Sequence, residues 1–185
     1  FLIDHGADMD VGNLKNETAT YWAARNGHTP IVQLLIERGA DISVEDFEGW
    51  TPLDWAIIGQ NVEAVKLLLD TNPGCDGKEK ALILAAEVGA HTTAQALLDA
   101  GAEVDWKDDA GSTALAWAVP AGHEEVARIL LRYGADVNAK DFWDNTSLHW
   151  GLPYDKLVRM LLDSGRKPDV IITDPPRKGC DGITL

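Results

Sequence analysis

Short apolar runs with helical spacing, each followed by a glycine, recur along this chain. One run covers residues 31–36 and ends before Gly39, and another covers residues 126–131 and ends before Gly134. A glycine just past a helix supplies the left-handed residue that lets the last helical carbonyls find partners. Each run therefore predicts a short helix that ends near its glycine.

A second short helix is predicted before each of these runs. It begins at Thr51-Pro52, because threonine caps helix N-termini and proline is tolerated at the first helical position. A turn such as Gly27-His28 separates it from the apolar run, and a polar, extended segment follows the closing glycine. Segments of the same type begin at Thr18, Thr113 and Thr146.

These landmarks recur with a period of 33 residues. Gly6 and Gly39 are 33 residues apart, and so are Gly101 and Gly134. Such short helices are marginal in isolation because helix nucleation is costly, so they must be stabilised by stacking on their neighbours. The pattern predicts an all-α repeat solenoid.

The repeated unit resembles the ankyrin repeat. The resemblance is carried by Gly-Trp-Thr-Pro-Leu at 49–53, Ala-Ala-Arg-Asn-Gly-His at 23–28 and the stretch 130–139. It implies helix–turn–helix–hairpin units, and we predict five complete repeats with partial units at both ends, in one domain over residues 1–185. The expected boundaries are a partial unit at 1–12, repeats at about 13–45, 46–74, 75–107, 108–140 and 141–171, and an insertion-bearing hairpin with the start of a further repeat at 172–185.

Three departures from the repeat pattern are expected to alter the structure locally. Lys80 stands where the capping threonine belongs, so the third repeat should lack that side-chain cap. Gly39 and Gly101 are 62 residues apart, less than two periods, which indicates a shortened hairpin around Asn72. Gly134 and Gly165 are 31 residues apart, which indicates a shortened inter-helix turn near Pro153-Tyr154.

The charge balance excludes several classes of partner. The chain has 16 basic and 30 acidic residues, a net charge of −14. Nucleic acid and anionic membrane surfaces need clustered Lys and Arg, and no apolar run is long enough for a membrane helix. Two cysteines, Cys75 and Cys180, with no leader segment, predict an intracellular protein, cytoplasmic or nuclear. Because the chain starts at Phe1 rather than at a methionine, we expect a monomeric array within a longer chain.

No cofactor, metal or catalytic site is predicted. The resemblance implies structural roles for His28 and His123 in the inter-helix turns and for His149, which should bond back toward Thr146. The acidic segment 105–109 lacks the spacing of a calcium loop, so we interpret it as a solvated face.

The seven tryptophans divide into two groups. Trp22, Trp55, Trp117 and Trp150 recur at one position of the first helix. We expect them to be packed between neighbouring repeats, with their indole N–H groups either bonded or left at the solvent edge.

The other tryptophans fall in the hairpins. In ankyrin proteins the hairpin tips and the exposed face of the first helix form the binding surface. An alternative for the two phenylalanines is that they fold back over the hairpin base, and for Trp106 that it packs under the next hairpin. Carried over by register, the predicted partner-binding residues are Phe47, Glu48, Trp50, Phe142, Trp143, Trp106, Arg25, Asn26 and Ile58.

The predicted function is a protein–protein interaction module, a scaffold or adaptor without catalysis. Carboxylates around the hairpin aromatics favour a partner with a basic and apolar segment. The alternative is a targeting or autoregulatory segment of a larger multidomain enzyme or signalling protein.

Residues 168–181 also resemble the Asp-Pro-Pro-Arg loop of RNA uracil-5 methyltransferases, which lies beside their S-adenosylmethionine pocket. That resemblance covers 14 residues, and the chain has no glycine-rich cofactor loop after a strand. We therefore favour a hairpin with inserted residues at this place.

Overall fold

The computed structural model describes residues 5–71, 77–151 and 154–164, and the chain divides into two compact units. The N-terminal unit covers residues 1–73 and the C-terminal unit residues 74–185. In both units the described residues repeat the order helix, turn, helix, hairpin. The predicted all-α repeat solenoid is therefore confirmed, while the number of repeats and their boundaries stay predictions.

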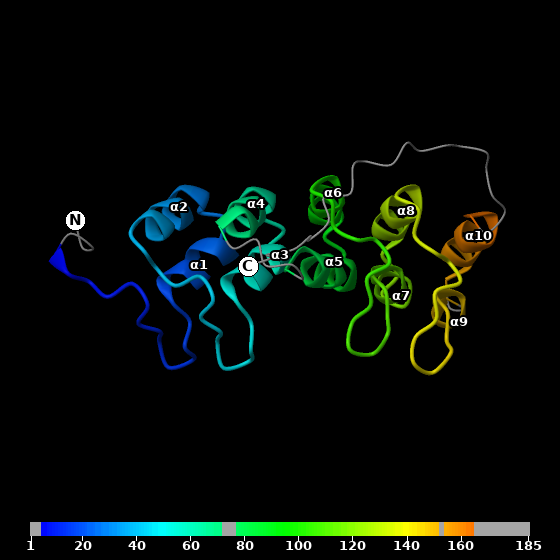
Figure 1. Ribbon diagram of the computed structural model, residues 1–185, viewed down its shortest axis with the longest axis horizontal. Coiled ribbons are helices and arrows are strands. Elements are labelled where there is room, and N and C mark those ends of the chain that lie inside the picture. The colour runs from blue at the N-terminus through cyan, green and yellow to red at the C-terminus, as the bar shows by residue number, and fades with distance from the viewer. Residues whose placement is uncertain (1–4, 72–76, 152–153, 165–185) are drawn as a thin grey trace, which may run out of the picture. The chain divides into compact units, whose positions relative to one another are not determined.

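The N-terminal unit has two layers of paired helices. The first helices α1 and α3 lie side by side, and the second helices α2 and α4 form a second layer, above them in the view of Figure 1. The core between the layers is small and aliphatic, with Ala24, Val32, Ala56 and Ile57 fully buried. The helices are α1 (Ala19–Arg25), α2 (Thr29–Glu37), α3 (Pro52–Ile58) and α4 (Val62–Thr71).

The C-terminal unit repeats this layering. Helix α7 packs against α5 and α9, and α8 packs against α6 and α10 (Figure 1). Each described helix pair contributes buried leucines to one continuous core: Leu82, Leu97, Leu115, Leu130 and Leu157. The helices are α5 (Gly77–Val88), α6 (His91–Asp99), α7 (Ala114–Ala118), α8 (Glu124–Arg132), α9 (Ser147–Gly151) and α10 (Asp155–Ser164).

The predicted threonine caps are present at two helices and missing at a third. The hydroxyl of Thr18 accepts the backbone N–H of Tyr21, and Thr51 forms a reciprocal capping box with Asp54. Thr113 has the same extended backbone, yet its Oγ1 is buried without a hydrogen-bond partner among the described residues. The prediction of a side-chain cap was wrong at this helix.

Residues with a left-handed backbone conformation recur at equivalent positions of the repeats. Gly39, Gly101 and Gly134 end second helices with φ near 85°, as predicted. Between the two helices of the second repeat, Gln60 has φ 56°, where other repeats have a glycine. A side chain in this conformation costs roughly 1 kcal/mol, so Gln60 is a locally strained position.

Neighbouring repeats are joined by one recurring side-chain bond at the start of the second helix. Asn61 Nδ2 donates to the carbonyls of Ala24 and Arg25, both at 2.9 Å. His123 Nε2 lies 3.0 Å from the carbonyl oxygen of Glu87 in the preceding repeat. These bonds provide partners for carbonyls at the ends of first helices, and they confirm the structural role predicted for His123.

Several predictions fall on residues outside the described ranges. These are the shortened hairpin at Asn72, the cysteines at 75 and 180, the turn at Pro153 and the methyltransferase-like stretch 168–181. Helix α5 begins at Gly77, three residues before Lys80, where the repeat pattern places the capping residue.

Candidate functional site

Each described hairpin tip is built on a single aspartate or asparagine. Asp108 Oδ1 accepts the backbone N–H groups of Ala110 and Ser112, at 2.9 and 2.8 Å. Asp141 makes the corresponding bonds to Trp143 and Asn145. The carboxylate therefore holds the turn closed, and the residues after it are displayed at the tip in a fixed conformation.

The second carboxylate oxygen of the same aspartate binds the first helix. Trp55 Nε1 donates to Asp46 Oδ2 at 2.9 Å, and Trp117 Nε1 donates to Asp108 Oδ2 at 2.7 Å. Burial acts to raise the pKa of Asp46, but the hydrogen bonds from the Trp50 backbone and the Trp55 indole outweigh it, and the pKa lies below its usual value. The hairpin and the helix thus form one rigid element.

The four repeated tryptophans differ in exposure, although Trp150 also bonds the aspartate of its own hairpin, Asp141. Trp55 and Trp117 are half-buried, whereas Trp22 and Trp150 have 44% and 45% of their surface exposed. The prediction that all four are packed between repeats was therefore wrong for Trp22 and Trp150. Next to Trp22, the smaller residue Ala23 is buried instead.

The predicted hairpin residues are mostly exposed. Phe47, Phe142 and Trp143 have 77%, 73% and 70% of their surface exposed, and Glu48 is exposed as well. Trp50 is half-buried and lies 6.4 Å from Trp55 between ring centroids. The alternative in which the two phenylalanines cover the hairpin base was wrong.

Phe142 nevertheless lies against the preceding hairpin. Its backbone N–H donates to the Ala110 carbonyl at 3.1 Å, and its ring lies so close to Gly111 that a Cβ there would stand 2.6 Å from it. Gly111 also has φ 75°, so two independent reasons require glycine at this tip. The ring is positioned by its neighbour while most of its surface faces solvent.

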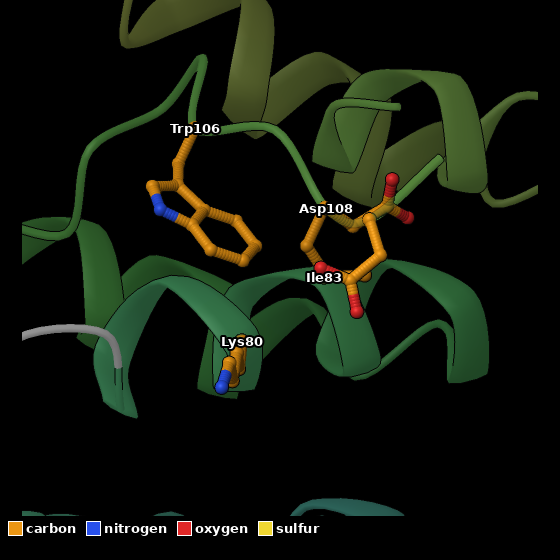
Figure 2. Close-up of a pocket in the computed structure, with 5 residues that line it drawn as sticks. Lys80, Ile83, Trp106 and Asp108 are labelled. Carbon is orange, nitrogen blue, oxygen red and sulfur yellow. The ribbon is translucent and has the colours of Figure 1, made fainter. Parts of the chain in front are cut away.

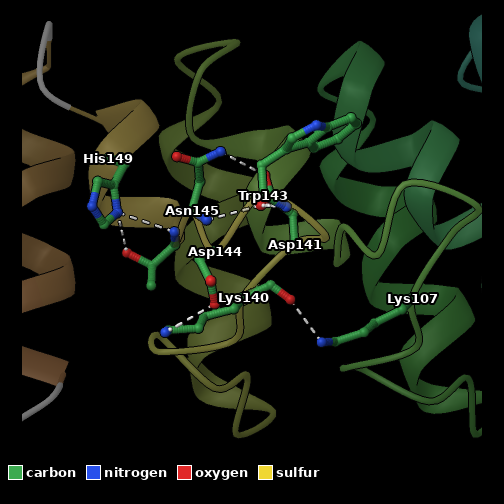
Figure 3. Close-up of polar contacts among 8 residues, drawn as sticks. Lys107, Lys140, Asp141, Trp143, Asp144, Asn145 and His149 are labelled. Atoms are coloured by element: carbon green, nitrogen blue, oxygen red, sulfur yellow. Dashed lines mark hydrogen bonds and ion pairs between the residues drawn. The ribbon is translucent and has the colours of Figure 1, made fainter.

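Two lysines of the last two described hairpins, Lys107 and Lys140, already have partners within the protein. Lys107 Nζ donates to the Lys140 carbonyl at 2.7 Å, and Lys140 Nζ pairs with Asp144 at 3.1 Å (Figure 3). The ring of His149 lies 3.0 Å from the Thr146 hydroxyl, as predicted (Figure 3). The polar side chains around Trp143 are therefore largely hydrogen-bonded or paired within the protein.

Trp106 is half-buried and lines a shallow, open pocket of about 200 Å³. Its indole stands over α5, where Lys80 and Ile83 form the other wall (Figure 2). Asp108 and Asp109 complete the lining. Trp106 therefore borders α5, and the alternative in which it packs under the next hairpin stays a prediction.

The first-helix residues of the N-terminal unit form a cluster around Arg25. The Arg25 guanidinium lies 4.7 Å from the Trp55 ring centroid and 5.4 Å from that of Trp22. Arg25 Nη1 also donates to the Tyr21 hydroxyl at 3.1 Å. Tyr21 packs edge-on against both indoles, at 5.1 and 5.4 Å. We call Tyr21, Trp22, Arg25 and Trp55 the arginine–indole cluster.

The other two predicted first-helix residues, Asn26 and Ile58, lie outside the arginine–indole cluster. Asn26 is exposed, and its Nδ2 donates to the Trp22 carbonyl at 2.8 Å. Ile58 is half-buried. The predicted site did not include buried Tyr21, half-buried Trp55 or exposed Trp22. Trp22 and Tyr21 stand three and four positions before Arg25, a spacing that places them beside it on one helix.

The described part of the chain holds no metal-binding group of three or more His, Cys, Asp or Glu side chains. Among its helices, none has the length and apolar content needed to cross a membrane.

Comparison with known families agrees with the geometry. A family model described as ankyrin repeats, in three copies, matches residues 1–81 and again residues 82–174. A search of curated proteins gives no significant match. Taken with the two layers of short helices and the projecting hairpins, the match shows that this chain belongs to the ankyrin repeat family, whose repeats are generally protein–protein interaction modules.

Proposed function

We propose that this chain is a scaffold or adaptor that binds a protein partner through its hairpin tips and first-helix faces, without catalysis of its own. The observation that carries the proposal is the exposure of Phe47, Phe142 and Trp143 on hairpins that are held rigid from within. Aromatic residues fixed on a rigid frame lose little entropy on binding, and they are the usual hot spots of interfaces.

The partner we propose has a basic and apolar segment. Glu48 and Asp109 are exposed beside the tip aromatics, and Asp144 is 84% exposed although it pairs with Lys140. Lys107 is engaged with the Lys140 carbonyl, and Lys140, in the hairpin of Trp143, is engaged with Asp144. A basic segment would therefore meet carboxylates at the tips rather than competing positive charge.

The absence of catalysis is proposed because the candidate acid–base residues are used structurally. His123 bridges to the preceding repeat, and His149 bonds the threonine that starts its own helix. The intracellular location stays a prediction from the sequence.

A pull-down with the 185-residue chain tests this proposal, using the Trp50→Ala/Trp143→Ala double variant beside the wild type. The double variant should lose the bound partner. Because Trp143 is mostly exposed, its truncation should leave thermal unfolding nearly unchanged, while truncation of half-buried Trp50 should lower stability modestly.

Leu162→Ala is the matched control, since Leu162 is an exposed apolar residue on α10, away from the hairpins. This variant should retain the partner. Equal binding by the wild type and the double variant would show that the hairpin tips are not the interface.

A further inference from the structure

Arg25 is the most distinctive charged residue of the N-terminal unit. Its guanidinium is fixed over two indole faces and bonded to the Tyr21 hydroxyl, and yet the residue is exposed. A stacked guanidinium is less hydrated than a free one and has lost most of its rotamer freedom before any ligand arrives. Binding of a ligand to Arg25 would therefore cost little further side-chain entropy.

Within the described residues Arg25 forms no ion pair with a carboxylate. Glu17 acts on Tyr21, the hydrogen-bond partner of Arg25, and contributes to raising the pKa of Tyr21 after the larger effect of burial. The Glu17 carboxylate accepts a bond from Asn13 Nδ2 at 2.6 Å. Only one hydrogen bond of the guanidinium is present, to a neutral phenol, so several of its N–H donors remain available.

The chain has 30 acidic and 16 basic residues, so an exposed positive charge is the less common kind on it. A guanidinium presents parallel N–H groups that match the two oxygens of a carboxylate. The exposed Trp22 ring lies beside it and offers an apolar contact. A partner would therefore meet Arg25 and Trp22, two residue types enriched in interface hot spots, while buried Tyr21 holds the guanidinium from below.

We propose that the arginine–indole cluster is a binding site for a carboxylate side chain of the protein partner, an Asp or Glu that follows or precedes an apolar residue packing on Trp22. This inference rests on the proposed function and adds one acidic contact to the basic and apolar segment inferred there.

Selection from a phage-displayed library of random short peptides tests the site directly. The full chain, its Arg25→Gln variant and its Lys66→Gln variant are screened in parallel. Lys66 is the matched control because it is an exposed cation of the same compact unit, on the second-helix layer. Asp or Glu next to an apolar residue should be enriched by the wild type and Lys66→Gln, but not by Arg25→Gln.

One selected peptide and its acid-to-amide version are then titrated into both proteins. The amide peptide should bind the wild type about tenfold more weakly, and Arg25→Gln should bind both peptides equally. Thermal unfolding of Arg25→Gln checks that the variant is folded at the titration temperature. Arg25→Lys keeps the charge without the planar fork, so it should restore only part of the affinity.

No acidic enrichment, no selected peptide at all, or the same acid-to-amide loss in both proteins would overturn the site. Arg25 would then serve only to join α1 to α3, and its replacement would lower stability without changing any acid preference. If partner capture still depends on Trp50 and Trp143 in that case, the carboxylate site fails while the proposed function stands.

Discussion

Trp117 donates its indole N–H to Oδ2 of Asp108 at 2.7 Å, nine residues earlier in the chain. The same pair recurs as Trp55 and Asp46 at 2.9 Å in the other compact unit. Because the same carboxylate also closes the hairpin turn, this bond fixes the tip relative to the helix. The exposed aromatic residues can therefore be held in place without being buried.

Removing that donor should destabilise the C-terminal unit. Trp117→Phe keeps an aromatic ring but leaves one carboxylate oxygen of Asp108 without its indole partner. The free energy of unfolding should fall by about 1–2 kcal/mol, measured by urea denaturation. Trp22→Phe is the comparison, because Trp22 has Asn13 nine residues earlier and no indole hydrogen bond among the described residues. A loss of the same size in both variants would show that ring size, rather than the bond, is responsible.

The hairpin aspartates should make the protein sensitive to acid. The pKa of Asp46 and that of Asp141 are lowered, since hydrogen bonds to each carboxylate outweigh the effect of burial. Their stabilisation is present above the unfolded-state pKa, about 3.9, and is lost as the pH falls through the lower folded-state value. Asp46→Asn and Asp141→Asn should reduce stability at neutral pH and flatten its decline in acid. Parallel pH profiles for variants and wild type, from thermal unfolding, would contradict this.

Asp105 should have the opposite pH dependence. Burial raises its pKa, and the charges of Asp136 and Glu103 act in the same direction, against the bond from the Asp136 backbone N–H. A raised folded-state pKa gives stability that is present below the unfolded-state pKa and lost as the pH rises through the folded value. Asp105→Asn keeps an acceptor for Asp136, so it should gain stability relative to the wild type as the pH rises from 3 toward 7, within roughly the range set by these pKa values. Chemical denaturation at several pH values measures it, and a constant difference would exclude the carboxyl as the cause.

The bonds between repeats should contribute measurably to stability. Asn61→Ala removes both bonds from Nδ2 to the carbonyls of Ala24 and Arg25. We expect a loss of about 1–2 kcal/mol in equilibrium unfolding, because the Arg25 carbonyl loses its side-chain donor and the Ala24 carbonyl keeps only backbone donors. Asn26→Ala serves as the control, since its bond is local and exposed, and it should cost clearly less. Equal losses would mean that the bond to the neighbouring repeat has no special value.

Relief of backbone strain should stabilise the second repeat. Gln60 has φ 56° and is exposed, so Gln60→Gly removes the strain without losing a buried contact. The gain should be about 0.5–1 kcal/mol, seen as a higher melting temperature. Gln33→Gly, inside α2, should instead destabilise by about 1 kcal/mol, because glycine is unfavourable within a helix. A destabilised Gln60→Gly would show that the glutamine side chain makes an important contact.

Much of the fold could be predicted because repeat position determines local structure. Thr51 caps its helix, Gly39 ends one, and Phe47, Phe142 and Trp143 lie exposed at the tips. Each of these outcomes depends on residues within a few positions along the chain. Because the repeats share one register, the local pattern of one repeat applies to the next. The exposure of the hairpin aromatic residues could therefore be predicted from the sequence.

What the sequence by itself determined is the repeated unit, its two helices, its left-handed glycines and the display of aromatic residues on the hairpins. Only the tertiary structure decided which face of each tryptophan is covered, that Thr113 lacks its cap bond, and that Arg25 lies over Trp22 and Trp55. The physical reason is that burial, and the contact of Arg25 with Trp55, depend on side chains of a different helix or hairpin, which local spacing does not specify. Periodicity shows which residues share a helix face, but packing decides which neighbour covers that face and which charge is left available to a partner.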